Sequence, residues 1–156
     1  MRRDANKPTG RQPRAADHEP ADSPITLRVL GALLCLGIAA IHIIDQGGMP
    51  GTKEPGYVQV LYYALEAGGV LTAAALLAPR YRARWLLALS VAVGPIVGYL
   101  LSRGPGLPNY TDDVGNWGET LGVIALAVEA ALLITAMTAL GVSRRRVRKY
   151  RHVTES

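Results

Sequence analysis

Four apolar stretches separate the polar segments of this 156-residue chain. They lie at about residues 25–44, 57–77, 84–101 and 117–140. An α-helix needs about 20 predominantly apolar residues to cross a hydrocarbon core of about 30 Å, and each stretch is close to that length. The connections between them are short, which favours antiparallel packing of successive helices. The sequence therefore predicts an all-α, four-helix transmembrane bundle.

The bundle is predicted to occupy residues 25–141, between two polar tails. Residues 1–24 mix Pro, Arg, Asp and Ala without apolar periodicity, which is typical of a disordered tail. The first apolar run begins too late for a signal peptide and has no small-residue cleavage pattern near its end. Residues 142–156 form a basic tail. The single cysteine, Cys35, lies within an apolar stretch and is expected to be a small packing residue.

Positive charge is distributed unevenly along the chain. Fifteen of the 17 Lys and Arg residues fall in the two tails, the start of the first stretch and the turn near residues 80–84. The other two loops contain only Lys53 and Arg103. The positive-inside rule then predicts that both termini are cytoplasmic and that these loops face outward, in the plasma membrane of a bacterium. This topology explains the net charge of +5, so lipid rather than nucleic acid is the expected partner.

Polar residues within the apolar stretches are concentrated toward the predicted outer side. His42 and Asp45 are three residues apart at the end of the first stretch, on one helix face. From the helical rise, Glu66 and Glu129 lie about 13–15 Å below the outer ends of their helices. Charged groups at such depth are costly and mark candidate functional sites. We expect an outward-facing polar pocket formed by His42, Asp45, Tyr62, Tyr63, Glu66, Tyr99 and Glu129.

Each of these groups also has a structural explanation. His42 could hydrogen-bond Asp45, and the two glutamates could lock helix packing as protonated or tyrosine-bonded carboxyls. A divalent metal site formed by His42, Glu66 and Glu129 is a weaker interpretation, because no compact motif supports it. No cofactor is indicated. The other histidines lie in the tails, so the membrane region contains one histidine. A haem ligated by two membrane histidines is therefore excluded.

The segment between the third and fourth stretches, SRGPGLPNYTDDVGNWGE, is predicted to be a structured lid. Proline fixes φ and glycine permits unusual angles, so Gly-Pro-Gly-Leu-Pro should form a rigid turn. Arg103 is expected to pair with one or more of three acids, namely Asp112, Asp113 and Glu119. In the preceding stretch, Gly94 and Gly98 have a spacing that lets helices pack closely, and Pro95 should bend the helix.

The same segment resembles a group of small, chiefly actinobacterial, four-helix membrane proteins of uncharacterised function. The resemblance rests on Ser102-Arg103, Gly106-Leu107-Pro108, Asp112-Asp113, Gly115-Asn116-Trp117 and Glu129, with His42 at the outer end of the first helix. It implies the four-helix fold and supplies no activity.

Several functional classes remain open from the sequence. The chain has no phosphate-binding glycine loop, HExxH, GxSxG or EF-hand pattern, which argues against a familiar enzyme class. We favour a non-catalytic membrane protein that binds a small ligand or ion, or an accessory subunit of a homo-oligomer or larger membrane complex. One alternative is a proton-coupled transporter component that uses Glu66 and Glu129. Another is a haem- or quinone-binding redox subunit that uses His42.

Overall fold

The computed structural model of the chain describes residues 23–78 and 83–154, with side chains as far as residue 141. This part of the chain contains four α-helices: α1 (Ile25–Asp45), α2 (Gly56–Leu77), α3 (Arg84–Arg103) and α4 (Thr120–Thr154). All four are long and apolar enough to cross a membrane. The protein is thus an all-α, multi-pass membrane protein with a four-helix bundle. Most of the predicted N-terminal tail, residues 1–22, lies outside the described residues.

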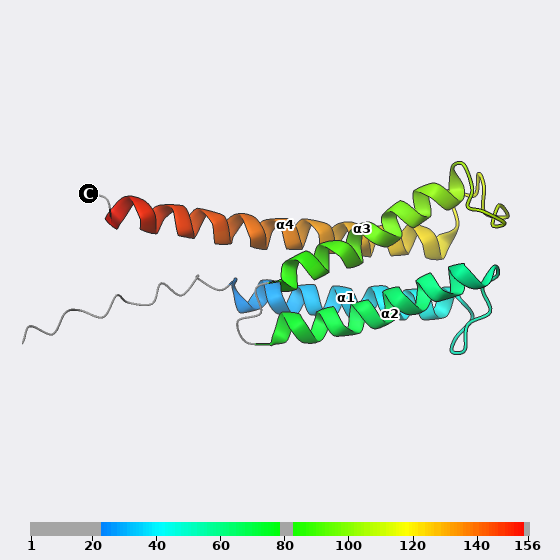
Figure 1. The fold of residues 1–156 in the computed structure, drawn as a ribbon, viewed down its shortest axis with the longest axis horizontal. Coiled ribbons are helices and arrows are strands. Elements are labelled where there is room, and N and C mark those ends of the chain that lie inside the picture. The colour runs from blue at the N-terminus through cyan, green and yellow to red at the C-terminus, as the bar shows by residue number, and fades with distance from the viewer. Residues whose placement is uncertain (1–22, 79–82, 155–156) are drawn as a thin grey trace, which may run out of the picture.

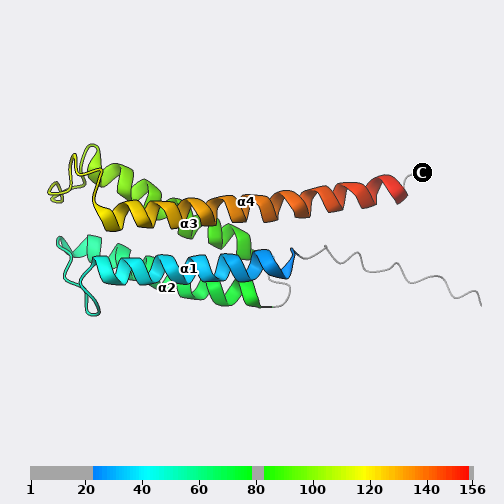
Figure 2. The same ribbon diagram turned by 180° about the vertical axis from the view of Figure 1, so that it is seen from behind.

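The helices form a ring in chain order. α1 packs against α2 and α4, and α3 packs against α2 and α4. The loops at 46–55 and 104–119 lie together at one end of the bundle, here called the loop end (Figure 1). Seen from both sides, α3 slants away from α2 toward the loop end and approaches the start of α4 there (Figures 1 and 2).

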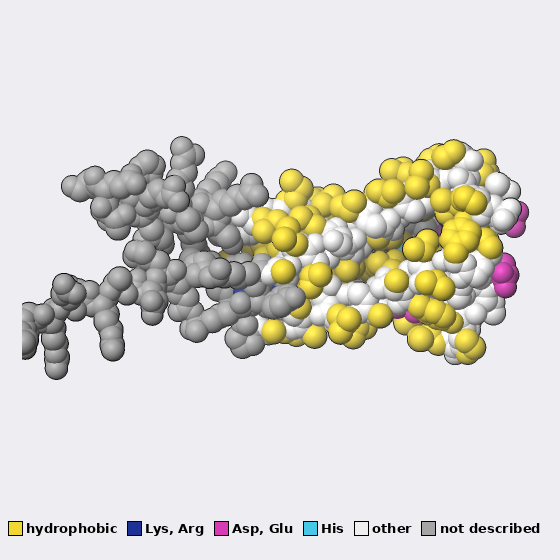
Figure 3. Space-filling view, viewed as in Figure 1, with side chains coloured by type: hydrophobic (Ala, Val, Ile, Leu, Met, Phe, Trp, Pro, Cys, Tyr) yellow, Lys and Arg dark blue, Asp and Glu magenta, His cyan; other side chains and the backbone are white. Residues whose placement is uncertain are grey.

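The outer surface of the ring is apolar. Large hydrophobic side chains on all four helices are exposed, which suits contact with lipid tails rather than water. They include Leu33 on α1, Leu71 on α2, Leu86 on α3 and Ile134 on α4, each 59–68% exposed. Figure 3 shows hydrophobic side chains along the described helices and acidic ones at the loop end.

The backbones of α1 and α2 approach each other closely at a glycine of α2. A Cβ built on Gly69 would lie 3.0 Å from the backbone oxygen of Cys35 and 3.3 Å from Cβ of Ala39. Cys35 itself is fully buried in the core, as expected of a packing residue. Small residues allow helix backbones to approach closely in membranes. Gly69 is the small residue that allows this between α1 and α2.

The predicted close packing through Gly94 and Gly98 is wrong for the described chain. A Cβ built on either glycine would have no neighbour within 4 Å beyond the backbone of α3. Both glycines and Pro95 instead line a cavity. The helix itself is continuous through Pro95.

The fourth helix differs from its predicted span of 117–140 at both ends. α4 begins at Thr120 because the Glu119 carboxylate caps it, accepting hydrogen bonds from the backbone N–H groups of Leu121 (3.3 Å) and Gly122 (3.0 Å). It then continues past Gly141 to Thr154, where the sequence has no proline and is rich in arginine, a good helix former.

The opposite end of the bundle is held by an arginine. The Arg28 side chain donates to the carbonyl oxygens of Leu76 (2.7 Å), Leu77 (2.8 Å) and Ala78 (2.9 Å). These are unpaired acceptors at the C-terminal end of α2, where a cation is also favoured by the helix dipole. Arg28 therefore ties the start of α1 to the end of α2.

Candidate functional site

A cavity of about 480 Å³ lies between α2 and α3, with α1 and α4 contributing to its lining. Part of its lining is exposed, including Leu61 and Ala64 of α2 and Leu87 and Gly94 of α3. These residues belong to membrane-spanning helices. The cavity therefore opens sideways, between two helices, and its mouth is apolar.

Two titratable side chains, one from α1 and one from α4, face each other in this cavity. His42 Nε2 lies 3.8 Å from Glu129 Oε1, and these side chains are 12% and 2% exposed. The other ring nitrogen of His42, Nδ1, is 2.9 Å from the backbone oxygen of Ile38. A separation of 3.8 Å is too long for a hydrogen bond. Within the described residues, Glu129 has no hydrogen-bond partner.

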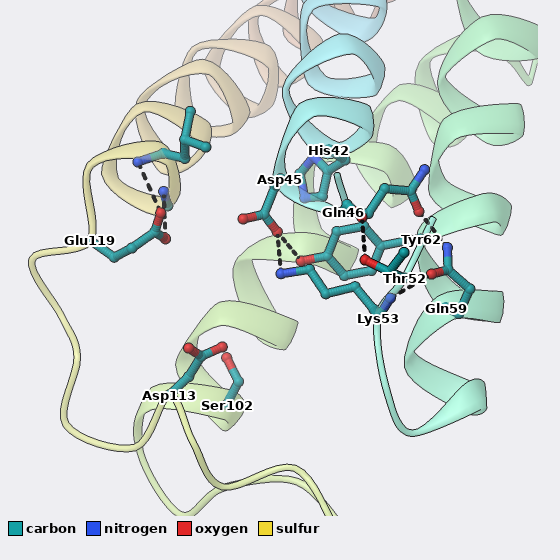
Figure 4. Close-up of polar contacts among 12 residues, drawn as sticks. His42, Asp45, Gln46, Thr52, Lys53, Gln59, Tyr62, Ser102, Asp113 and Glu119 are labelled. Atoms are coloured by element: carbon teal, nitrogen blue, oxygen red, sulfur yellow. Dashed lines mark hydrogen bonds and ion pairs between the residues drawn. The ribbon is translucent and has the colours of Figure 1, made fainter. Parts of the chain in front are cut away.

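A second polar cluster lies at the loop end of the same cavity (Figure 4). The Tyr62 hydroxyl donates a hydrogen bond to the Asp45 carboxylate. Lys53 Nζ, from the loop between α1 and α2, lies 3.1 Å from Asp45 Oδ2. The His42 ring packs beside that of Tyr62, with centroids 5.4 Å apart. Asp45 thus bonds to Tyr62 and Lys53 rather than to His42, whose hydrogen-bond partner is its own helix backbone.

Arg103 joins the end of α3 to the lid and to α4. Its guanidinium lies 3.2 Å from Asp113 Oδ2 and 3.0 Å from Glu119 Oε2, two of the three acids with which the sequence predicted it would pair. The third, Asp112, is exposed. The guanidinium also stacks on the Tyr99 ring, 4.6 Å from its centroid. The side chain is 11% exposed, so a buried charge is balanced by two carboxylates.

The lid forms a tight turn over the end of α3. Leu107 and Tyr110 exchange two backbone hydrogen bonds of 2.9 Å across Pro108 and Asn109. Asn109 has a φ of 56°, so proline followed by a left-handed residue makes the pattern typical of a type II turn. The Tyr57 hydroxyl of α2 donates to the Pro108 carbonyl oxygen at 2.8 Å, which links the start of α2 to the lid.

Tyr110 in this lid also lines the cavity. Its hydroxyl donates to Asp113 Oδ2 at 2.7 Å. Burial, followed by this hydrogen bond to a carboxylate, raises the pKa of Tyr110 above its usual value. The phenol therefore stays protonated and helps to hold Asp113 beside Arg103.

The structure separates two residues from the predicted pocket. Glu66 and Tyr63 are not among the residues that line the cavity. Tyr63 accepts a hydrogen bond from the backbone N–H of Gly51 at 3.0 Å. Glu66 is buried, and neither of its carboxyl oxygens has a hydrogen-bond partner among the described residues. Successive residues on a helix point about 100° apart, so Tyr62 and Tyr63 fall on opposite sides of the α1–α2 contact.

Neither does the structure assemble the suggested metal site. No group of three or more His, Cys, Asp or Glu side chains in the described residues is placed to hold a metal ion. His42 and Glu129 share the cavity, but Glu66 does not line it.

Sequence reasoning missed several residues that shape the site. Gln46, directly after the last residue of α1, is buried, and its side-chain oxygen accepts a hydrogen bond from Gln59 of α2 (Figure 4). Gly122 lets the Tyr99 ring pack directly against α4, since a Cβ there would lie only 2.7 Å from the ring. Gln46 follows directly after Asp45, and that adjacent pair of polar residues was a usable signal. Nothing in the sequence singled out Gly122.

Comparison with known proteins adds no relative, because no family model, curated protein or solved structure matches the chain. The resemblance to small actinobacterial membrane proteins therefore stays a prediction.

Proposed function

We propose that this membrane protein binds a small ligand in the α2/α3 cavity and is a binding protein or accessory subunit rather than a catalyst. The observation that carries the proposal is the cavity itself. Its volume of about 480 Å³ is in the range of small-molecule sites. Its lining is largely apolar, with a few polar groups converging from separate helices, which is also typical of such sites.

The proposal places the protein in a bacterial plasma membrane with both termini in the cytoplasm. Its support is the charge distribution, with fifteen of 17 basic residues assigned to the cytoplasmic side. The lid and the polar clusters would then face outward. A reporter fused after residue 156, active only in the cytoplasm, tests this orientation. A reporter that works only outside the membrane would contradict it.

Two other functions involve the same groups. A haem- or quinone-binding redox subunit would use His42, which lies in the cavity. A proton carrier that uses Glu66 together with Glu129 receives no support from the geometry, because only Glu129 lines the cavity.

The test is to fill the cavity without disturbing the fold. Gly94→Leu should place its side chain in the open space beside α3, where a Cβ meets no neighbour within 4 Å. Gly141→Leu is the matched control, since Gly141 is also helical, has equally open surroundings and does not line the cavity. Wild type and both variants are purified in nanodiscs, and native mass spectrometry identifies the molecules that each retains beyond bulk lipid.

We expect wild type and Gly141→Leu to retain the same small molecule and Gly94→Leu to lose it. A haem or quinone found in this way would favour the redox alternative. Equal retention by all three proteins would overturn the assignment to this cavity. Folded wild-type protein that retains nothing would count against ligand binding altogether.

A further inference from the structure

Carboxylates outnumber cations around the cavity. Its charged lining consists of Asp45, Glu119 and Glu129 against one guanidinium, that of Arg103. The Arg103 charge is already balanced, because two carboxylates lie within 3.2 Å of it. Lys53 balances Asp45 at 3.1 Å. Glu129 is the acid left without a fixed cation, so the cavity disfavours an anionic ligand and favours a cationic one.

With Glu129 ionised, the contact between His42 and Glu129 lacks a hydrogen-bond donor. The backbone oxygen of Ile38 can only accept, so the 2.9 Å contact requires a hydrogen on Nδ1 of His42. In the neutral ring, Nε2 then presents a lone pair to the cavity. Glu129 Oε1, 3.8 Å away, is also an acceptor when ionised. Two acceptors facing each other in a nearly dry site call for a donor between or beside them.

Glu129 is a buried residue of the cavity wall rather than a charge on the protein surface. Its side chain is 2% exposed, it lines the cavity, and it has no hydrogen-bond partner among the described residues. An unpaired carboxyl in the membrane interior is costly. A ligand with an N–H donor and a positive charge supplies what both Glu129 and His42 lack.

The route into the cavity selects the rest of the ligand. The mouth between α2 and α3 is bordered by exposed apolar residues of membrane-spanning segments. A molecule that enters there comes from the hydrocarbon phase and needs an apolar body. Inside, the rings of Tyr62 and Tyr99 line the cavity and add apolar surface for such a body, while Lys53 and Arg103 already lie over these rings, 5.4 Å and 4.6 Å from their centroids.

We infer that the cavity binds a lipophilic amine that enters from the bilayer between α2 and α3, with its ammonium group held by the Glu129 carboxylate and Nε2 of His42. This inference rests on the proposed function and specifies its ligand class. The geometry distinguishes an amine from an anionic lipid, which would place its charge beside the Glu129 carboxylate.

Three probes that share one rigid apolar body test the inference: pyrenemethylamine, pyrenemethanol and pyrenecarboxylate. Each is titrated into protein in nanodiscs of neutral lipid, with empty nanodiscs as the blank, and saturable binding is measured by fluorescence anisotropy. The proteins are wild type, Glu129→Gln, Glu129→Asp, Gly94→Leu and the control Gly141→Leu. Size-exclusion profiles and helical circular dichroism establish that each variant is folded.

We expect the amine to bind wild type and Gly141→Leu with equal affinity and at least about tenfold more tightly than the alcohol, the scale of a hydrogen bond to a charged group. Glu129→Gln should lose about the same factor, since it retains the shape without the charge. Glu129→Asp should retain more of the amine preference than Glu129→Gln. Gly94→Leu should abolish saturable binding.

The possible failures are distinguishable. Tightest binding of the carboxylate or the alcohol, blocked by Gly94→Leu, would refute the amine while leaving ligand binding in the cavity intact. Amine binding that folded Glu129→Gln retains would refute the role of Glu129. If no probe binds saturably while native mass spectrometry still shows a ligand lost in Gly94→Leu, the amine class is wrong and the proposed function stands.

Discussion

The contact at Gly69 predicts how sensitive the bundle is to one methyl group. A Cβ at this position would lie 3.0 Å from the backbone oxygen of Cys35 and 3.3 Å from Cβ of Ala39. Non-bonded carbon atoms pack best at about 3.5–4.0 Å, so the added methyl group overlaps its neighbours. Because one of these neighbours is backbone, relief requires that α1 and α2 move apart.

Two opposing effects set the magnitude for Gly69→Ala. Overpacking costs about 1–3 kcal/mol, whereas replacing a helical glycine with alanine contributes about 1 kcal/mol of stability. We expect the overlap to dominate and lower the free energy of unfolding by up to about 2 kcal/mol. Gly68→Ala is the control on the adjacent residue, since its Cβ would lie 3.9 Å from Val91 Cγ2, an ordinary contact. It should leave stability unchanged or raise it by up to about 1 kcal/mol.

The assay is unfolding by SDS in mixed micelles, followed by far-ultraviolet circular dichroism. The order of midpoints should be Gly68→Ala, then wild type, then Gly69→Ala. If Gly69→Ala proves as stable as Gly68→Ala, the helices are not held at the distance described, and the reasoning fails.

Two further predictions concern the ends of the bundle. Arg28→Met retains the apolar stem but removes the charged donor from three carbonyl groups at the C-terminal end of α2. It should lower the free energy of unfolding by about 2–3 kcal/mol in the same SDS titration. Arg28→Lys should recover part of this loss. A midpoint unchanged in Arg28→Met would contradict the cap. At the loop end, the pKa of Tyr110 is raised in the folded protein, so its contribution to stability is present below about pH 10 and is lost as the pH rises beyond that. Thermal melts across this range should show a smaller alkaline loss for Tyr110→Phe than for wild type, and an identical loss would refute the prediction.

Much of the fold follows from local properties of the sequence. The length of each apolar run predicted the number of helices and most of their bounds, because crossing hydrocarbon requires a fixed number of helical residues. The pairing of Arg103 with Asp113 and Glu119 was predictable because a short, turn-rich lid keeps these residues close to the end of α3. The start of α4 was predicted three residues too early, at residue 117; the helix begins at Thr120, where the Glu119 carboxylate caps it and also binds Arg103 of α3.

The candidate site was predicted only in part. His42, Asp45, Tyr62, Tyr99 and Glu129 all line the cavity, whereas Glu66 and Tyr63 do not. A residue's position in the sequence defines its angle around its own helix, but not where the neighbouring helices lie. On α2, Tyr62 faces the cavity whereas Tyr63 and Glu66 do not, and that division depends on where the partner helices lie.

The glycines show the same distinction. Sequence spacing alone marked Gly94 and Gly98 as small positions on one face of an apolar helix and predicted a close helix contact there. In the folded chain the close contact is made at Gly69, while the slant of α3 turns Gly94 and Gly98 toward an open cavity. Composition and periodicity determine which segments enter the membrane, because the free energy of moving a helix from water into lipid depends on that helix's own residues. Whether a small residue closes a contact or opens a site depends on helix crossing, which is a property of the assembled pairs.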